Sequence, residues 1–382
     1  MSIRGSHDNY VLRGSSRGIA IGLIALFLVA VGFHEAAAQV SVTPGFKIEL
    51  INEDIPYLAG NSAGVAVVPN GFGSYGGDVL VTYRGTNGDL FDGEILRVDV
   101  DLGTRSLFAE VDGNPNHIAF GPGGSFGTDL YVSSNQNPSV TQRGRVWTVS
   151  SGGTVSAFGD QDPGSNVSQQ FGGVGLAFST GGPFGEHLYS GTSGGFSGDS
   201  ITRLTPAGGT ASLFYSFGSI LDGSPRGMAF GPGTGGFGED LYFGIKTTNT
   251  SPPEAGVHVL DSSGNRTTLV EASDPMSNGL ITSIGEISFS PGGSFGDDLY
   301  AADMSGSILR IDSVGNTSEF VSGLDFAFGT GFDGTDNFYL TGVDPSTGYL
   351  NLYRVTPIPE PSTYVMAAIG LLGLLAYRRF RS

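Results

Sequence analysis

The chain has 382 residues, of which 64 are glycine, 26 are phenylalanine and none is cysteine, and its formal net charge is −18. Without cysteine, disulfides and Cys-ligated zinc or iron–sulfur sites are excluded, and so acidic a surface repels phosphate backbones, which excludes nucleic acid as a partner. Abundant glycine and aromatic residues without a Gly-X-Y period indicate many short strands joined by tight turns.

The first 38 residues are organised as a secretory signal peptide. Three arginines precede the apolar run IAIGLIALFLVAVGF (19–33), and the small residues after it end at a predicted cleavage site, Ala38. Fifteen apolar residues are short for a membrane span, although an uncleaved anchor is the alternative. We therefore expect an exported protein whose mature chain starts at residue 39.

One sequence segment recurs six times between residues 64 and 340. HIAFGPGGSFGTDLYV (117–132) returns as GLAFSTGGPFGEHLYS (175–190), GMAFGPGTGGFGEDLYF (227–243) and EISFSPGGSFGDDLYA (286–301), with looser copies at 64–81 and 325–340. Each copy is followed by a second segment in which apolar residues alternate with others, such as ILRVD (95–99) or ILRID (308–312). A short third segment such as LF (107–108) follows in five of the six units.

Each unit therefore contains four short strands, which is typical of a blade of a β-propeller. Six units predict an all-β, six-bladed propeller of four-stranded blades over residues 39–356, with a solenoid as the alternative. Because the sixth unit lacks the third segment, its outer strand must come from another part of the chain. The unassigned, alternating stretch Phe46 to Leu50 precedes the first unit, and we expect it to close the ring beside residues 352–356.

We interpret the first repeated segment as structural and not as a functional site. Its glycines supply the positive φ angles of a tight turn, and its aromatic residue is expected to fold back as a plug onto the blade: Phe126, Phe184, Phe237 and Phe295, with Tyr75 in the first copy. Asp129, Asp240 and Asp298 precede a strand and are expected to accept backbone N–H groups of the turn. A calcium site in these loops is the alternative, for which only DGTDN (333–337) comes close.

The second segment of the units contains a recurring arginine and, in one unit, a tryptophan. Arg97, Arg203, Arg310 and Arg354 occupy one strand position, so we expect them on an exposed face or in ion pairs between blades. Trp147, the single tryptophan, is expected in the core. No GxSxG, HExxH or P-loop motif occurs.

Over about residues 45–356 the repeat pattern resembles that of the NHL-type and gluconolactonase-type six-bladed propellers. Such propellers bind ligands in the central channel, near the start of each innermost strand. The residues at that place are the candidate site residues: Asn61, Asn116, His117, Arg226, Glu286 and Asp325.

The resemblance implies a channel calcium ion held by an acid of the first blade and by Asn and Asp of others, a role that would fall to Asn116 and Asp325. The first-blade acid is missing, because Asn61-Ser62-Ala63 stands there. Glu286 is the residue that would replace it.

The end of the chain reads PIPEPSTYVMAAIGLLGLLAYRRFRS (357–382): the motif Pro359-Glu360-Pro361, an apolar stretch, and Arg378, Arg379 and Arg381. It resembles the PEP-CTERM sorting tail of exported proteins in Gram-negative bacteria. The resemblance implies recognition by an exosortase, a membrane protease-transpeptidase, with residues 357–363 as linker and 364–382 as transmembrane and basic tail. The arginines fit a cytoplasmic end; an ordinary C-terminal anchor is the alternative.

Without both ends, which hold six arginines and two acids, 12 basic and 34 acidic residues remain, a net charge of −22. We expect an exported protein that passes through an inner-membrane intermediate to the cell surface or the medium. Its predicted function is non-catalytic binding or structure in the exopolymer layer, with a glycan or protein ligand and no cofactor. The alternative is a calcium-dependent, lactonase-type hydrolase with a site in the channel.

Overall fold

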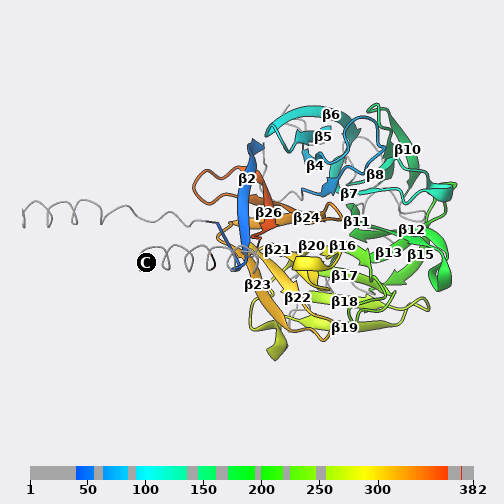
Figure 1. Ribbon diagram of the computed structural model, residues 1–382. Helices are drawn as coiled ribbons and strands as arrows, with labels where there is room; N and C mark the ends of the chain where they lie inside the picture. The colour runs from blue at the N-terminus through cyan, green and yellow to red at the C-terminus, as the bar shows by residue number, and fades with distance from the viewer. Residues whose placement is uncertain are drawn as a thin grey trace, which may run out of the picture. The chain divides into compact units, whose positions relative to one another are not determined.

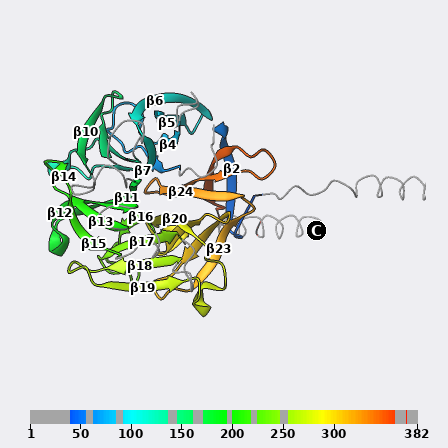
Figure 2. The same ribbon diagram turned by 180° about the vertical axis from the view of Figure 1, so that it is seen from behind.

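The computed structural model describes residues 40–55, 63–84, 92–135, 145–160, 171–193, 199–217, 224–246, 255–359 and 371. Over these residues the chain is all-β, and its six small sheets stand as blades around a ring (Figures 1 and 2). The innermost strands of successive blades contact one another, including those of the sixth and first blades. The predicted six-bladed propeller is confirmed. None of the described helices has the length and apolar character needed to span a membrane.

Each blade consists of four strands, which follow one another from the innermost outward. They are β3 (Val65–Val67), β4 (Val79–Arg84), β5 (Asp92–Asp99) and β6 (Thr104–Asp112) in blade 1; β7 (Asn114–Phe120), β8 (Leu130–Asn135), β9 (Arg145–Val149) and β10 (Val155–Asp160) in blade 2; β11 (Phe171–Thr180), β12 (Glu186–Ser193), β13 (Ser200–Leu204) and β15 (Ser212–Ser216) in blade 3; β16 (Ser224–Phe230), β17 (Leu241–Lys246), β18 (Gly256–Leu260) and β19 (Arg266–Glu271) in blade 4; β20 (Ile284–Phe289), β21 (Leu299–Asp303), β22 (Ser307–Ile311) and β23 (Thr317–Ser322) in blade 5; and β24 (Phe326–Phe332), β25 (Phe338–Val343), β26 (Leu350–Pro357) and β2 (Phe46–Ile55) in blade 6.

Short elements complete these sheets. The two-residue strand β1 (Ser41–Val42) pairs with β23, and β14 (Gly209–Thr210) pairs with β10. The 3-10 turns η1 (Gly124–Phe126), η2 (Gly182–Phe184) and η4 (Gly293–Phe295) follow the innermost strands of blades 2, 3 and 5, and η3 (Pro275–Ser277) precedes blade 5. We call the end of the propeller that carries the turns after the innermost strands the turn face, and the end where the innermost strands begin the mouth face.

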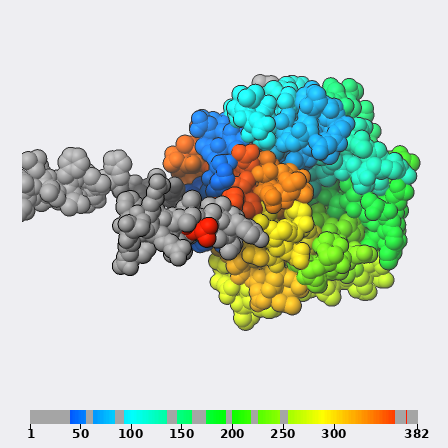
Figure 3. All heavy atoms as spheres, in the orientation of Figure 1, coloured from blue at the N-terminus to red at the C-terminus, as the bar shows by residue number. Residues whose placement is uncertain are grey.

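The N-terminal strand closes the ring, as predicted. β2 runs antiparallel to β26 and pairs Phe46 with Pro357 and Leu50 with Tyr353, so this N-terminal strand lies against the last blade (Figure 3). Glu49 on β2 also accepts a hydrogen bond from the guanidinium of Arg354 at 2.9 Å. The burial of this strand is partial: Phe46 and Ile48 are half-buried and Leu50 is 49% exposed.

The aromatic plugs hold neighbouring blades together. Phe126 of blade 2 is buried and lies edge-on to Phe178 of blade 3, with ring centroids 4.9 Å apart. The same contact recurs at three later seams, between Phe184 and Phe230, Phe237 and Phe289, and Phe295 and Phe332. A plug therefore packs on the next blade as well as on its own, where Phe126 lies edge-on to Tyr131. The expected contact with its own blade is accompanied by one across the seam.

In blade 1 the plug is Phe72, not Tyr75. Phe72 is 3% exposed and its ring lies 4.8 Å from that of Phe120 in blade 2. Tyr75 is half-buried at the edge of the blade, where Arg97 stacks over its ring. The sequence of the looser first copy does not show which aromatic residue is the plug, because VPNGFGSYGG (68–77) contains both Phe72 and Tyr75.

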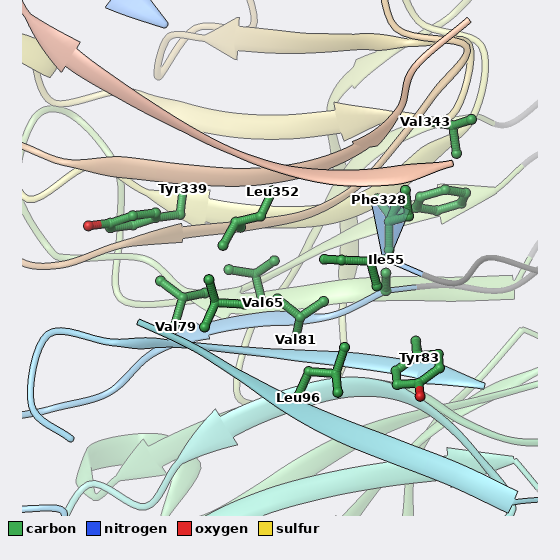
Figure 4. Packing of buried hydrophobic residues seen from close by; sticks show 13 residues of the cluster. Ile55, Val65, Val79, Val81, Tyr83, Leu96, Phe328, Tyr339, Val343 and Leu352 are labelled. Carbon is green, nitrogen blue, oxygen red and sulfur yellow. The ribbon is translucent and has the colours of Figure 1, made fainter. Parts of the chain in front are cut away.

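The seam between blades 6 and 1 has no such plug among the described residues. Its core contains Val65, Val79, Val81, Leu96 and Leu352, together with the aromatic rings of Phe328, Tyr83 and Tyr339 (Figure 4). Val67 pairs with Val79 as Phe120 pairs with Leu130 in blade 2, so valine stands where later blades have the receiving phenylalanine.

Three of the recurring arginines, Arg97, Arg310 and Arg354, make ion pairs within their blades, whereas Arg203 stacks over Phe214. Arg97 reaches Asp78, and Arg310 reaches Asp298, the acid that precedes the second strand of the same blade. The carboxylate of Asp298 thus bonds an arginine, which corrects the predicted role of accepting turn N–H groups, and the pairs do not cross between blades. Trp147 is buried in the core, and its Nε1–H donates to Ser134.

Candidate functional site at the channel mouth

The innermost strands approach one another closely on the mouth face. A Cβ atom on Gly175 would collide with the carbonyl oxygen of Arg226 on the next blade, and one on Gly227 would collide with the backbone of Glu286. Only glycine permits backbones to come so near. The space left on the axis is a cavity of about 20 Å³, lined by Ala63, Asn116, His117, Val174, Arg226, Gly227, Gly285, Glu286, Met304 and Phe328.

Across this cavity, blades 2 and 5 are joined by one buried pair. Nε2 of His117 lies 2.8 Å from Oε1 of Glu286, and both side chains are less than a tenth exposed. In a six-membered ring these blades stand opposite each other, so the pair spans the axis. Burial raises the pKa of Glu286, whereas His117 and the backbone N–H groups of Thr330 and Val65 favour its charged form.

A guanidinium stands beside this pair with one donor unused. Nε of Arg226 is buried and has no hydrogen-bond partner in the described part of the chain, and the same holds for Nδ1 of His117. Burial lowers the pKa of Arg226, and the charge of the buried Asp199 opposes that effect. Burial and the charge of Arg226 also lower the pKa of Lys246, which pairs with Ser224 two residues before Arg226.

The site residues predicted from the sequence did not include the aromatic side chains of the mouth. Phe328 lines the cavity, and Phe326 stacks on it with ring centroids 6.0 Å apart and 17° between the ring planes. Phe326 is 41% exposed, so one aromatic ring faces solvent at the mouth and is supported by a second. Lys246 was missed as well, because no motif marks it.

Four of the six candidate residues, Asn116, His117, Arg226 and Glu286, line the same cavity. Asp325 does not, because it is exposed and lies outside β24. The pairing of Phe332 with Phe338 matches that of Phe120 with Leu130, which places Phe328 where blade 2 has Asn116. Asp325 therefore precedes the channel position by three residues. Asn61 falls outside the described residues.

The residues at the mouth do not fit a calcium ion. Calcium takes six to eight oxygen ligands, largely from carboxylates and carbonyls. Among the described lining residues Glu286 is the one carboxylate, and it is bonded to His117. Over the described ranges no three metal-ligating side chains gather at one place. In DGTDN, the carboxylate of Asp333 accepts hydrogen bonds from Thr335 and Asn337, so that loop closes on itself.

A larger hollow lies on the turn face. It measures about 390 Å³ between blades 3 and 4, and its lining includes Phe184, Phe230, Glu239 and Asp240. Burial and the neighbouring charge of Asp261 raise the pKa of Asp240. No basic residue belongs to the described lining of this hollow.

Solved structures of similar fold include two enzymes named for arabinose-containing substrates and a gluconolactonase. An α-L-arabinofuranosidase of Fusarium graminearum in complex with an iminosugar inhibitor is 12% identical, with a TM-score of 0.54 over 80% of this chain and 96% of that one. An α-L-arabinanase of Penicillium chrysogenum is 13% identical, with a TM-score of 0.51 over 84% and 98%. A gluconolactonase of Xanthomonas campestris is 13% identical, with a TM-score of 0.49 over 85% and 99%. At these identities the likeness establishes the fold alone.

The fold thus defines a six-bladed β-propeller. Residues 357–381 match the PEP-CTERM protein-sorting motif, so this propeller is an exported protein of the kind that an exosortase sorts toward the cell surface. No curated protein matches the sequence.

Proposed function

We propose that the propeller is a non-catalytic binding and structural protein of the exopolymer layer, which its sorting tail delivers to the cell surface. The observation that carries this proposal is the filled channel mouth. The His117–Glu286 pair crosses the axis and leaves a cavity of about 20 Å³. Pockets that enclose a small-molecule substrate measure about 300–1,000 Å³, so the mouth can receive the tip of a ligand but not a sugar ring.

The side chains at the mouth also argue against hydrolysis. Glycoside hydrolysis ordinarily uses two carboxyl groups on opposite sides of the bond that breaks, whereas the described part of the cavity lining holds a single acidic side chain, that of Glu286. The alternative, a calcium-dependent lactonase, would need oxygen ligands that the described mouth does not assemble. We therefore favour binding.

The proposal is tested with the mature body, residues 39–361. It should sediment with exopolymer from the native host, and it should not open sugar lactones or cleave arabinan, with or without calcium. Calcium bound at the channel would stabilise the fold by about 2.7 kcal/mol at a hundredfold excess over its Kd. A melting shift of that size together with lactone opening would replace the proposal by the lactonase alternative.

The sorting step is tested on the exported protein itself. We propose that the chain is cleaved near Pro361, because its apolar stretch of 16 residues is short for a permanent anchor and its arginines resist transfer across the membrane. The intact mass of the surface or released fraction should lack residues 362–382. A mass that includes them would identify the tail as a simple anchor.

A further inference from the structure

We infer that the channel mouth binds the carboxylate end of an acidic sugar, a uronate. This inference rests on the proposed binding function and names the ligand class of the same site. Three features carry it: an unused guanidinium donor, a locally balanced charge in an otherwise acidic protein, and an exposed aromatic ring beside a cavity that admits a small polar group.

The guanidinium of Arg226 supplies the first feature. Its Nε–H is buried at the cavity without a partner in the described residues, and an unsatisfied buried donor of this kind is costly. A carboxylate oxygen offers the strongest partner for a guanidinium, because both groups are planar and the bond is charge-assisted. Its geometry differs from that of the half-buried arginine of blade 3, Arg203, which stacks over Phe214.

The charges around Arg226 supply the second feature. The chain has twice as many acidic as basic residues, yet Arg226 and Lys246 come close enough on blade 4 to repel each other. Asp199 offsets one of these charges, and Glu286 is bonded to His117. The formal charges of Arg226, Lys246, Asp199 and Glu286 therefore cancel, so the mouth repels an anion less than the rest of this acidic protein does.

The two phenylalanines supply the third feature. Phe328 lines the cavity, and Phe326 stacks on it and exposes its ring to solvent. The negative face of an aromatic ring attracts the C–H groups of a sugar, so Phe326 offers a platform for a pyranose outside the cavity. A volume of about 20 Å³ exceeds the roughly 10–15 Å³ that one water requires, which is room for a carboxylate oxygen. The sugar ring stays outside, and its carboxylate enters.

The experiment titrates the mature body with three probes: D-glucuronate, D-glucose and acetate. Glucuronate combines the ring and the charge, whereas glucose has only the ring and acetate only the charge. We expect glucuronate to bind with a millimolar or lower Kd and each of the other probes at least tenfold more weakly, with affinity falling as sodium chloride is raised. Equal binding of glucose and glucuronate, or no binding of glucuronate, overturns the inference.

Variants locate the binding. Arg226→Gln should weaken glucuronate at least tenfold, whereas the matched variant Arg203→Gln, on the outer part of blade 3, should leave it unchanged. Phe326→Ala removes an exposed side chain, so it should fold normally, and it should weaken glucuronate without changing the binding of acetate. If neither Arg226→Gln nor Phe326→Ala alters the affinity, the ligand lies elsewhere and the inference is wrong.

Exopolymer sedimentation separates this inference from the proposed function. If the body sediments with exopolymer but does not bind glucuronate, the binding function stands and the uronate site is wrong. If exopolymer sedimentation also fails, the proposed function falls with it.

Discussion

Two kinds of seam join the blades. At five seams, a phenylalanine from the turn of one blade lies against a phenylalanine of the next, as Phe295 does with Phe332. At the sixth seam, between blades 6 and 1, aliphatic side chains around Val65 and Leu352 fill the space instead. The aromatic seams join blades that follow each other in the chain, whereas the aliphatic seam joins its two ends.

The difference shows that ring closure is achieved by backbone pairing rather than by a plug. The turn of blade 6 reads DGTDN and contains no aromatic residue, but β2 pairs with β26 along most of its length. Phe46 on β2 also reaches back to blade 5, where its ring lies 5.0 Å from Phe295 and 5.1 Å from Phe320. The closing strand thus adds an aromatic contact at the seam between blades 5 and 6.

The largest effect is expected from removing the closing strand. Deletion of residues 42–50 leaves blade 6 with three strands and exposes the edge of β26, which invites aggregation. It also removes the packing of Phe46 and Ile48, each worth up to about 1.5–3 kcal/mol when fully buried. The melting temperature should fall sharply, or the protein should aggregate, while deletion of residues 362–382 should leave melting unchanged. A truncated body that melts like the parent contradicts the proposed closure.

A plug should contribute more than an aliphatic residue of the closing seam. Phe295→Ala removes a fully buried ring and should cost about 3–5 kcal/mol in the free energy of unfolding. Val65→Ala removes two methyl groups and should cost about 1–2 kcal/mol. Urea unfolding of both variants measures the contrast, and equal losses would mean that the plugs add nothing particular to their seams.

A smaller effect is expected from the tyrosine that steadies the plug. Tyr300 donates its hydroxyl to the carbonyl oxygen of Phe295 at 2.8 Å within a buried cluster, so Tyr300→Phe should cost about 1 kcal/mol. At the closing seam, Tyr339 bonds Arg354, which keeps Glu49 as a second partner, so Tyr339→Phe should cost less. Denaturant midpoints at constant m-value test this order, and a reversed order refutes it.

The smallest effect concerns pH. Burial raises the pKa of Glu286 above its unfolded value near 4.5, so between these two values the folded protein binds more protons than the unfolded chain. The contribution of Glu286 to stability is therefore present below the unfolded pKa and declines as pH rises through the folded pKa. Glu286→Gln should flatten this decline in unfolding curves taken across that range. Identical pH profiles of variant and parent would show that Glu286 does not titrate there.

Most of the fold could be predicted from the sequence because the blades repeat. The alternating strands and the repeated turn sequence predicted six blades. The absence of the third segment from the last unit predicted the closing strand, which the pairing of β2 with β26 confirms. The errors arose where copies are irregular. Aligning the last copy on Asn337-Phe338-Tyr339, the counterpart of Asp129-Leu130-Tyr131, would have placed Phe328 rather than Asp325 at the mouth.

The chemistry of the mouth was less predictable for a geometric reason. His117 and Glu286 are 169 residues apart and on opposite blades, and their contact depends on how narrow the ring is. That width follows from backbones meeting at glycines such as Gly175 and Gly227. Likewise, the stacking of Phe326 on Phe328 depends on the register of β24, which the irregular last turn obscures.

The polarity of β26 determines how the body is presented. β26 runs from Leu350, opposite Val343 at the mouth face, to Pro357, opposite Phe46 on the turn face. The next residue, Ile358, is still bonded through its N–H to the carbonyl oxygen of Gly45, and the sorting motif begins at Pro359. We therefore expect a body held through this end to have its turn face nearer the attachment, with the opening that carries Arg226 and Phe326 on the opposite face.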